Sequence, residues 1–218
     1  MLVAIDTATD QASLALHDGF RVRAEQTWEA RRQQTRQLSP RLHAAMRHAN
    51  VSPEQLSGVT VTTGPGSFTG LRIGMSVAKG LAMAQTIPLV GVRTLDVIAS
   101  AQGRDRRRLA AVLQAGRRRI SIAFYRWQGG SWHIQEEPHL TTWTKLTEEL
   151  IEPTIFCGEI DPSGADTLAR LGDQAVLLPA AWRLRRAGFL AELGWRRLKR
   201  GDVDDPSTLT PTYLKHPV

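Results

Sequence analysis

The fold of this chain is decided by residues 58–85, GVTVTTGPGSFTGLRIGMSVAKGLAMAQ. The β-branched run at 59–62 predicts a strand, and the small residues from about 71 to 85 predict a helix. Between them lies a loop, 64–70, that contains three glycines. A strand, a glycine loop and a helix in this order present backbone N–H groups to an anion, and the same glycines allow another backbone to approach closely. Phosphate binding and close packing are therefore both open for this loop.

The glycine spacing argues against the two common phosphate-binding motifs. A Walker A loop needs Lys-Ser or Lys-Thr directly after its last glycine, whereas Leu-Arg follows Gly70 here. The spacing of Gly64, Gly66 and Gly70 also differs from that of the dinucleotide fingerprint. We therefore favour a structural role for Gly64, Gly66 and Ser67, and keep proximity to a nucleotide as the alternative.

Small residues recur along the helix at intervals of four: Gly70, Gly74, Ala78 and Ala82. Residues at this spacing lie on one face of a helix, so the stripe allows a second helix to pack closely. The second helix belongs either to the core of this chain or to a partner. We expect Phe68, just before the stripe, to anchor the loop in a pocket.

The first predicted strand, at 2–6, ends in Asp6, which Thr7 follows. An aspartate at a strand end is able to orient water or a metal-bound phosphate, and a capped turn explains the same residue equally well. Strands at 12–19 and 20–28 follow, with a hairpin turn at 17–19. Three such strands begin some nucleotide-binding lobes and also make ordinary meanders.

The remaining pattern predicts two α/β lobes. A helix is predicted at 30–49, with a kink or restart at Pro40, and a buried strand at 86–92 precedes a helix capped by Thr94. The polar stretch 102–108 is the predicted boundary between an N-terminal lobe, 1–102, and a C-terminal lobe, 103–218. Strands and helices continue through the second lobe to a helix at 186–200 and a polar tail.

The composition is that of a globular protein, and its basic charge permits but does not prove work beside nucleic acid or another polyanion. The 218 residues carry a net charge of +7, with a pI near 10.4. Arginines cluster at 104–108, 117–119, 183–186 and 196–200. These clusters form either a solvated basic face or a surface that binds RNA or an acidic partner. Neither a signal peptide nor a membrane span is predicted, and the single Cys157 suits the core of a cytoplasmic protein.

The histidine, cysteine and serine residues of the sequence match no catalytic or metal-binding motif that we identify. The six histidines are scattered without His-x-x-x-His spacing, and Cys157 has no second thiol, so no metal site is expected. Ser67 lacks the Gly-x-Ser-x-Gly elbow of serine hydrolases.

Three segments together resemble the TsaB (YeaZ) family: LVAIDTATDQASLAL at 2–16, GPGSFTGLRIGMSVAKGLA at 64–82 and IPLVGVRTLD at 87–96. The likeness is close over 1–100, and the GPGSFTGLRIG block is highly specific. It is weaker over 101–218, where the strand order and the TPTYLK ending at 210–215 still agree with the family.

The resemblance implies the two-lobed actin-like, Hsp70 and sugar-kinase (ribonuclease H-like) α/β fold, with mixed sheets flanked by helices. It also implies a mainly scaffolding, non-catalytic role in making threonylcarbamoyladenosine at position 37 of tRNA. The family pairs with the catalytic paralog TsaD, which carries the metal-binding histidines and the nucleotide site, and the ATPase TsaE joins the assembly. No cofactor is then expected on this chain alone.

Members of the family also form homodimers through helices of the N-terminal lobe, and this surface is reused for TsaD. The helices at 34–49 and after Gly70 are the candidates for it in this chain. The predicted interface residues are Thr35, Leu38, Leu42, Phe68, Gly70, Leu71, Gly74 and Ala78.

The chain departs from the family pattern in two places. Gln34-Thr35 replaces a His-Ser or His-Thr pair, and Gln114 and Arg119 replace two acids in the second lobe. Two alternative functions stay open. One is an ATP-using kinase-like or acyl-transfer enzyme built on Asp6, Thr7 and the loop 64–70. The other is a tRNA-binding module built on the arginine clusters.

Overall fold

The computed structural model describes residues 1–116 and 118–214, which form two compact units. Unit 1 contains Met1–Val97 and Arg185–Thr212. Unit 2 contains Ile98–Leu184 together with Tyr213 and Leu214. Arg117 of one predicted arginine cluster, and Lys215 and His216 near the C-terminus, lie outside the described residues.

Unit 1 is built on a five-stranded sheet in the order β3-β2-β1-β4-β5. The pairs β1–β2 and β2–β3 are antiparallel, whereas β1–β4 and β4–β5 are parallel. The three strands expected before the glycine loop are therefore present as an antiparallel meander. The bounds are β1 Leu2–Asp6, β2 Gln11–His17, β3 Val22–Glu29, β4 Gly58–Gly64 and β5 Leu89–Arg93.

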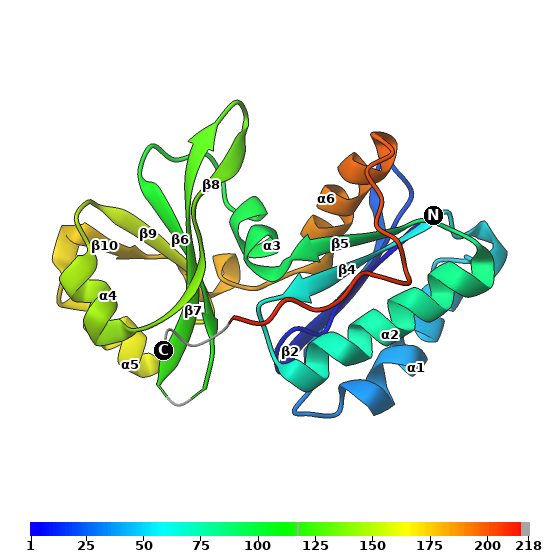
Figure 1. The fold of residues 1–218 in the computed structure, drawn as a ribbon, viewed down its shortest axis with the longest axis horizontal. Coiled ribbons are helices and arrows are strands. Elements are labelled where there is room, and N and C mark those ends of the chain that lie inside the picture. The colour runs from blue at the N-terminus through cyan, green and yellow to red at the C-terminus, as the bar shows by residue number, and fades with distance from the viewer. Residues whose placement is uncertain (117, 215–218) are drawn as a thin grey trace. The chain divides into compact units, whose positions relative to one another are not determined.

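Helices cover both faces of this sheet, so its central strands β1 and β4 are buried on both sides (Figure 1). The helices α1, Gln34–His48, and α2, Phe68–Gln85, share a core with Val3 and Ile5 of β1. The helix α6, Ala187–Lys199, packs with Leu2 and Ala4, which point to the opposite face. A short helix, α3, Thr94–Ser100, follows β5.

Unit 2 has its own five-stranded sheet, in the order β10-β9-β6-β7-β8. Helices α4, Trp143–Glu149, and α5, Pro162–Ala169, pack on it, and Asp161 caps α5 by accepting a hydrogen bond from the Gly164 N–H. Cys157 is fully buried in β9, and this burial raises the pKa of its thiol. The strands are β6 Arg108–Gln114, β7 Arg119–Gln128, β8 Ser131–Thr142, β9 Thr154–Gly158 and β10 Ala175–Leu177.

Two features differ from the sequence-based expectation. Helix α1 continues through Pro40 without a restart; Pro40 lies on the exposed side, where water can reach the carbonyl that its missing N–H leaves unpaired. The chain also does not divide at a single point after residue 102, because α6 and the segment up to Thr212 return to unit 1. There α6 supplies a hydrophobic layer that the first 97 residues lack on that face of their sheet.

Candidate functional site

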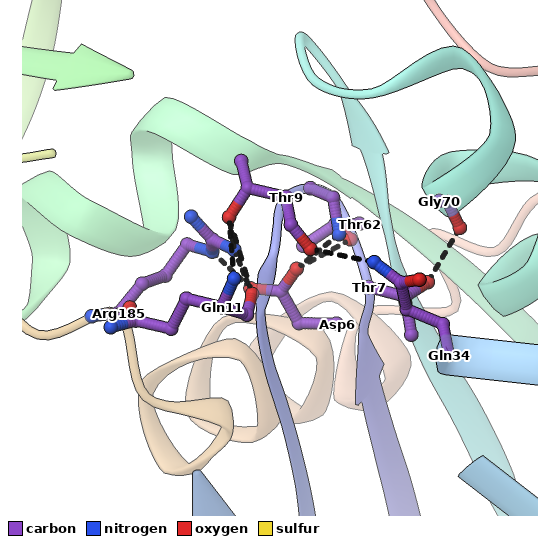
Figure 2. Close-up of polar contacts among 9 residues, drawn as sticks. Asp6, Thr7, Thr9, Gln11, Gln34, Thr62, Gly70 and Arg185 are labelled. Carbon is purple, nitrogen blue, oxygen red and sulfur yellow. Dashed lines mark hydrogen bonds and ion pairs between the residues drawn. The ribbon is translucent and has the colours of Figure 1, made fainter. Parts of the chain in front are cut away.

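The end of β1 places Asp6 at the centre of a buried polar cluster (Figure 2). The side chains of Asp6 and Thr7 are fully buried, where β1 runs beside β4. The Oδ1 atom of Asp6 accepts a hydrogen bond from the Ala8 backbone N–H at 2.9 Å and another from the Thr62 hydroxyl at 3.1 Å. The first of these bonds closes a turn at the strand end, as in the capped-turn interpretation of the sequence.

The other carboxylate oxygen of Asp6, Oδ2, forms an ion pair with Nε of Arg185, which lies 179 residues further along the chain. Arg185 is only 2% exposed. Its Nη2 donates to the Thr9 hydroxyl at 2.9 Å and to the Gln11 carbonyl at 2.7 Å, and its backbone N–H donates to the Gln11 side chain at 3.0 Å. Arg185 therefore closes the turn between β1 and β2 from the side of α6 (Figure 2).

These residues do not fit a metal ion or a nucleotide phosphate at Asp6. The carboxylate already accepts from an N–H, a hydroxyl and a guanidinium, so a metal ion would have to displace a buried cation to reach it. Elsewhere in 1–116 and 118–214, no cluster of three or more His, Cys, Asp or Glu residues is arranged to hold a metal. The arrangement provides a structural ion pair rather than an acid, a base or a ligand.

Three N–H groups in the glycine loop and at the start of α2 are used within the chain. The Ser67 N–H donates to the Ala8 carbonyl at 2.6 Å, and the Ser67 hydroxyl caps α2 by accepting from the Gly70 N–H at 3.2 Å. The Leu71 N–H donates to the Ser67 carbonyl at 2.9 Å. A phosphate at the start of α2 would have to compete with these bonds.

Close packing accounts for the three glycines of the loop. Each lies so near another backbone segment that a side chain would collide with a carbonyl oxygen. Gly64 also has a φ of +120°, which disfavours any other residue. The carbonyls concerned are those of Thr212 for Gly64, Ala8 for Gly66 and Thr7 for Gly70.

The small-residue stripe of α2 packs inside the chain, on β1. A side chain at Gly74 would collide with the Thr7 hydroxyl, which donates to the Gly70 carbonyl at 2.7 Å. The stripe therefore packs against the end of β1 and is not exposed to a second chain. Six of the eight predicted interface residues, on α1 and α2, are buried: Leu38, Leu42, Gly70, Leu71, Gly74 and Ala78.

The two remaining predicted interface residues, Thr35 and Phe68, are on the surface. Phe68 is 56% exposed, so it does not anchor the loop in a pocket as expected. Instead the guanidinium of Arg72 lies over its ring, 3.8 Å from the ring centroid. Thr35 follows Gln34, the first residue of α1, whose buried amide donates to the Thr9 carbonyl at 3.1 Å.

The outer face of α2 is a second stripe that the sequence analysis missed. Its members recur at intervals of three and four, are exposed, and include small residues at the centre and Met83, 69% exposed, near the end. Nothing lies within 4 Å of the position that a Cβ of Gly80 would take. We define the outer stripe of α2 as Thr69, Arg72, Ser76, Gly80 and Met83.

Two arginines of the predicted basic clusters are not on a solvated face. Arg185 is paired with Asp6, and Arg108, 7% exposed, pairs with Glu136 and lies over the Phe124 ring. Sequence reasoning missed both because each sits in a run of arginines. The only local signal was an apolar neighbour: Leu109 directly follows Arg108, and Leu184 directly precedes Arg185.

The two residues of unit 2 that depart from the family pattern, Gln114 and Arg119, lie at the β6–β7 turn. Gln114 ends β6, and its amide donates to the Glu159 carbonyl at 3.2 Å. Arg119 begins β7, and its N–H donates to the Gly116 carbonyl at 3.0 Å.

Comparison with known proteins identifies relatives in one pathway. The family model described as TsaD, tRNA N6-adenosine threonylcarbamoyltransferase, matches residues 26–156, which is more than half of the chain. The Bacillus subtilis (strain 168) protein named tRNA threonylcarbamoyladenosine biosynthesis protein TsaB is 27% identical over 219 residues, covering 98% of this chain and 93% of that protein. The Escherichia coli (strain K12) protein of the same name is 33% identical over 157 residues, covering 71% and 63%.

The fold also matches a solved structure over nearly its whole length. YeaZ from Pseudomonas aeruginosa superposes with a TM-score of 0.80 at 26% identity, covering 98% of this chain and 99% of that chain. The two mixed sheets flanked by helices, expected from the sequence as an actin-like α/β fold, are confirmed. Within the described residues no helix is both long and apolar enough to span a membrane.

Proposed function

Because this chain belongs to the TsaB (YeaZ) family, we propose that it is a non-catalytic subunit that binds and activates a TsaD-type partner. The reaction is the transfer of a threonylcarbamoyl group to adenosine 37 of tRNA, in the cytoplasm. The relatives are named as biosynthesis proteins of the same modified nucleoside, which supports the pathway.

The observation that carries the non-catalytic role is the buried ion pair between Asp6 and Arg185. Asp6 is the acid that a nucleotide-using enzyme of this fold would need at the end of β1, and its carboxylate already accepts from three donors of this chain. The loop that follows β4 is committed to packing on Ala8 and Thr7. An enzyme that uses ATP at these residues therefore becomes the less favoured function. ATP and metal ions are assigned to the TsaD-type and TsaE-type partners.

The surface offered to the partner is the outer stripe of α2. Ser76 and Gly80 leave its centre flat, which lets a partner helix approach closely, and Phe68 and Met83 supply exposed apolar groups toward its two ends. A second copy of this chain can use the same stripe, so a homodimer forms when the catalytic partner is absent and competes with it.

Gly80→Leu tests this surface. A Leu at Gly80 has free space in the isolated chain, so the variant should fold normally but keep a partner helix at a distance. In size-exclusion chromatography with the purified TsaD-type protein, we expect the heteromer peak to be lost or strongly reduced. Circular dichroism and the melting temperature of the isolated variant should match those of the unchanged chain.

Gly103→Leu is the matched control, because that glycine lies in unit 2 and also has nothing within 4 Å of its Cβ position. This variant should bind the partner as the unchanged chain does. Full association of Gly80→Leu would place the interface elsewhere, and no association of the unchanged chain would remove the scaffolding proposal.

A further inference from the structure

The most exposed large hydrophobic side chain described in the structure is Phe20, at the tip of the β2–β3 hairpin in unit 1, with 92% of its surface open to solvent. The backbone that presents it is fixed. The Asp18 carboxylate accepts hydrogen bonds from the N–H groups of Phe20 and Arg21, both at 2.9 Å. The ring is therefore held outward by a closed turn.

The hairpin tip is braced against the C-terminal half of α6. Gly19, with a φ of +93°, faces the ring of Trp195 so closely that no side chain fits between them. The ring of His17 lies 5.8 Å from that of Trp195, and its Nε2 donates to Glu192 at 3.1 Å because its Nδ1 accepts from the Gly19 N–H. Strand tip and helix end therefore form one continuous surface of unit 1.

This surface is rich in cations that form no ion pair among the described residues, although the charge of Asp202 lies close enough to attract Arg200. Arg196, Lys199 and Arg200 are exposed at the end of α6, and none of them forms an ion pair with an acid within 1–116 and 118–214. Their neighbour Arg197 is different, since Asp202 holds it at 2.7 Å. Lys199 lies over the ring of Trp195, 5.6 Å from its centroid, which brings its charge toward the hairpin tip.

The acids near this surface are already engaged. Asp18 holds the turn and lies 3.5 Å from both Arg21 and Arg23. Glu192 accepts from His17. We define the hairpin surface as Phe20, Arg21, Arg196, Lys199 and Arg200.

We propose that the hairpin surface binds unpaired nucleotides of RNA. A base stacks on the exposed face of Phe20, and the phosphates on either side of it contact the cations of α6 and Arg21. A protein partner is less suited to it, because one ring and the 40%-exposed Val22 supply little apolar area among several charges. This inference rests on the proposed function only in taking the RNA to be a tRNA.

The test uses the full chain alone, without any partner protein, and a fluorescein-labelled tRNA anticodon stem–loop as the probe. Fluorescence anisotropy measures the dissociation constant over a series of salt concentrations. Phe20→Ala should weaken binding by about 5- to 100-fold, because a lost base stack has that effect, whereas Phe20→Trp should bind as well as the unchanged chain. Phe20 is exposed, so both variants should fold.

Arg196→Ala/Arg200→Ala should flatten the plot of log K against log salt, lowering its slope by about 1.5 for two lost phosphate contacts. Arg104→Ala/Arg106→Ala is the control, because it removes the same charge from an exposed loop of unit 2 and should leave the slope unchanged.

Several results would overturn the inference. They are no binding of the stem–loop at low salt, unchanged binding by Phe20→Ala, or an equal loss in the two arginine double variants. Binding to anionic phosphatidylserine vesicles that depends on Phe20, with RNA binding independent of it, would assign the surface to a membrane instead. Because the TsaD-type partner is absent from this assay, a negative result does not bear on the scaffolding proposal, which the Gly80→Leu association experiment tests separately.

Discussion

Arg185 and Asp6 have opposite charges and form a buried ion pair at the end of β1. Removing one member of such a pair leaves an uncompensated buried charge, which costs far more than the loss of an exposed pair. The neighbouring Arg186 is the natural comparison, since its side chain is 49% exposed and pairs with Glu25 at 2.5 Å. Substituting each of the two adjacent arginines removes the same charge, so a difference in stability between the variants reports the effect of burial.

Arg185→Ala should lower the free energy of unfolding by about 3–5 kcal/mol, because Asp6 would remain buried without its cation. Arg186→Ala should lower it by about 1 kcal/mol or less. Urea denaturation followed by circular dichroism measures both. Equal effects of the two substitutions would mean that the Asp6–Arg185 pair is not a structural element.

Asp18 should titrate far below an ordinary aspartate. Hydrogen bonds from the backbone N–H groups of Arg21 and Phe20 lower its pKa from 3.8 to about 2. Since the folded-state pKa is the lower one, its contribution to stability is present above about pH 4 and is lost as the pH falls toward 2. The carboxyl carbon shift of Asp18, followed by NMR against pH, measures this, and a midpoint near 3.8 would show that the turn is open in solution.

Helix α2 carries glycines on two faces with different roles. The sequence predicted the stripe of Gly70, Gly74 and Ala78 correctly as a close-packing face, because the spacing of four is a local property of a helix. It did not predict that the stripe packs on β1, since close approach inside a chain and between chains has the same spacing. The outer stripe escaped notice because Ser76 and Gly80 look like ordinary exposed residues until burial is known.

The same substitution at Gly74 and at Gly80 of α2 should have opposite effects. Gly74→Ala should lower the free energy of unfolding by about 1–3 kcal/mol, because the new methyl group collides with the Thr7 hydroxyl. Gly80→Ala should raise it by about 0.5–1 kcal/mol, since its Cβ meets no atom and Ala favours the helix. Thermal or urea unfolding checks both signs, and a stabilised Gly74→Ala would refute the packing of α2 on β1.

At the scale of the whole molecule, two sheets and most helix and strand positions could be predicted from local patterns. Hydrophobic alternation and the Asp161 cap of α5 are local, so they are visible in the sequence. The prediction that Thr94 caps a helix was wrong, because Thr94 is the first residue of α3 and its buried hydroxyl has no hydrogen-bond partner among the described residues. The return of α6 to unit 1, and with it the pairing of Asp6 with Arg185, is a contact across 179 residues that no spacing rule contains. The sequence predicts a partner surface on α2, and burial shows which faces of that helix are exposed.

The measurement that tests the central claim most directly is a reconstituted modification assay with labelled threonine, bicarbonate, ATP and tRNA. Purified TsaD-type and TsaE-type proteins, and the enzyme that supplies the threonylcarbamoyl group, are assayed with and without this chain. We predict that modified tRNA accumulates only when this chain is present, and that the chain alone neither hydrolyses ATP nor modifies tRNA. Full modification without it, or turnover by this chain alone, would contradict the proposed role of a non-catalytic activating subunit.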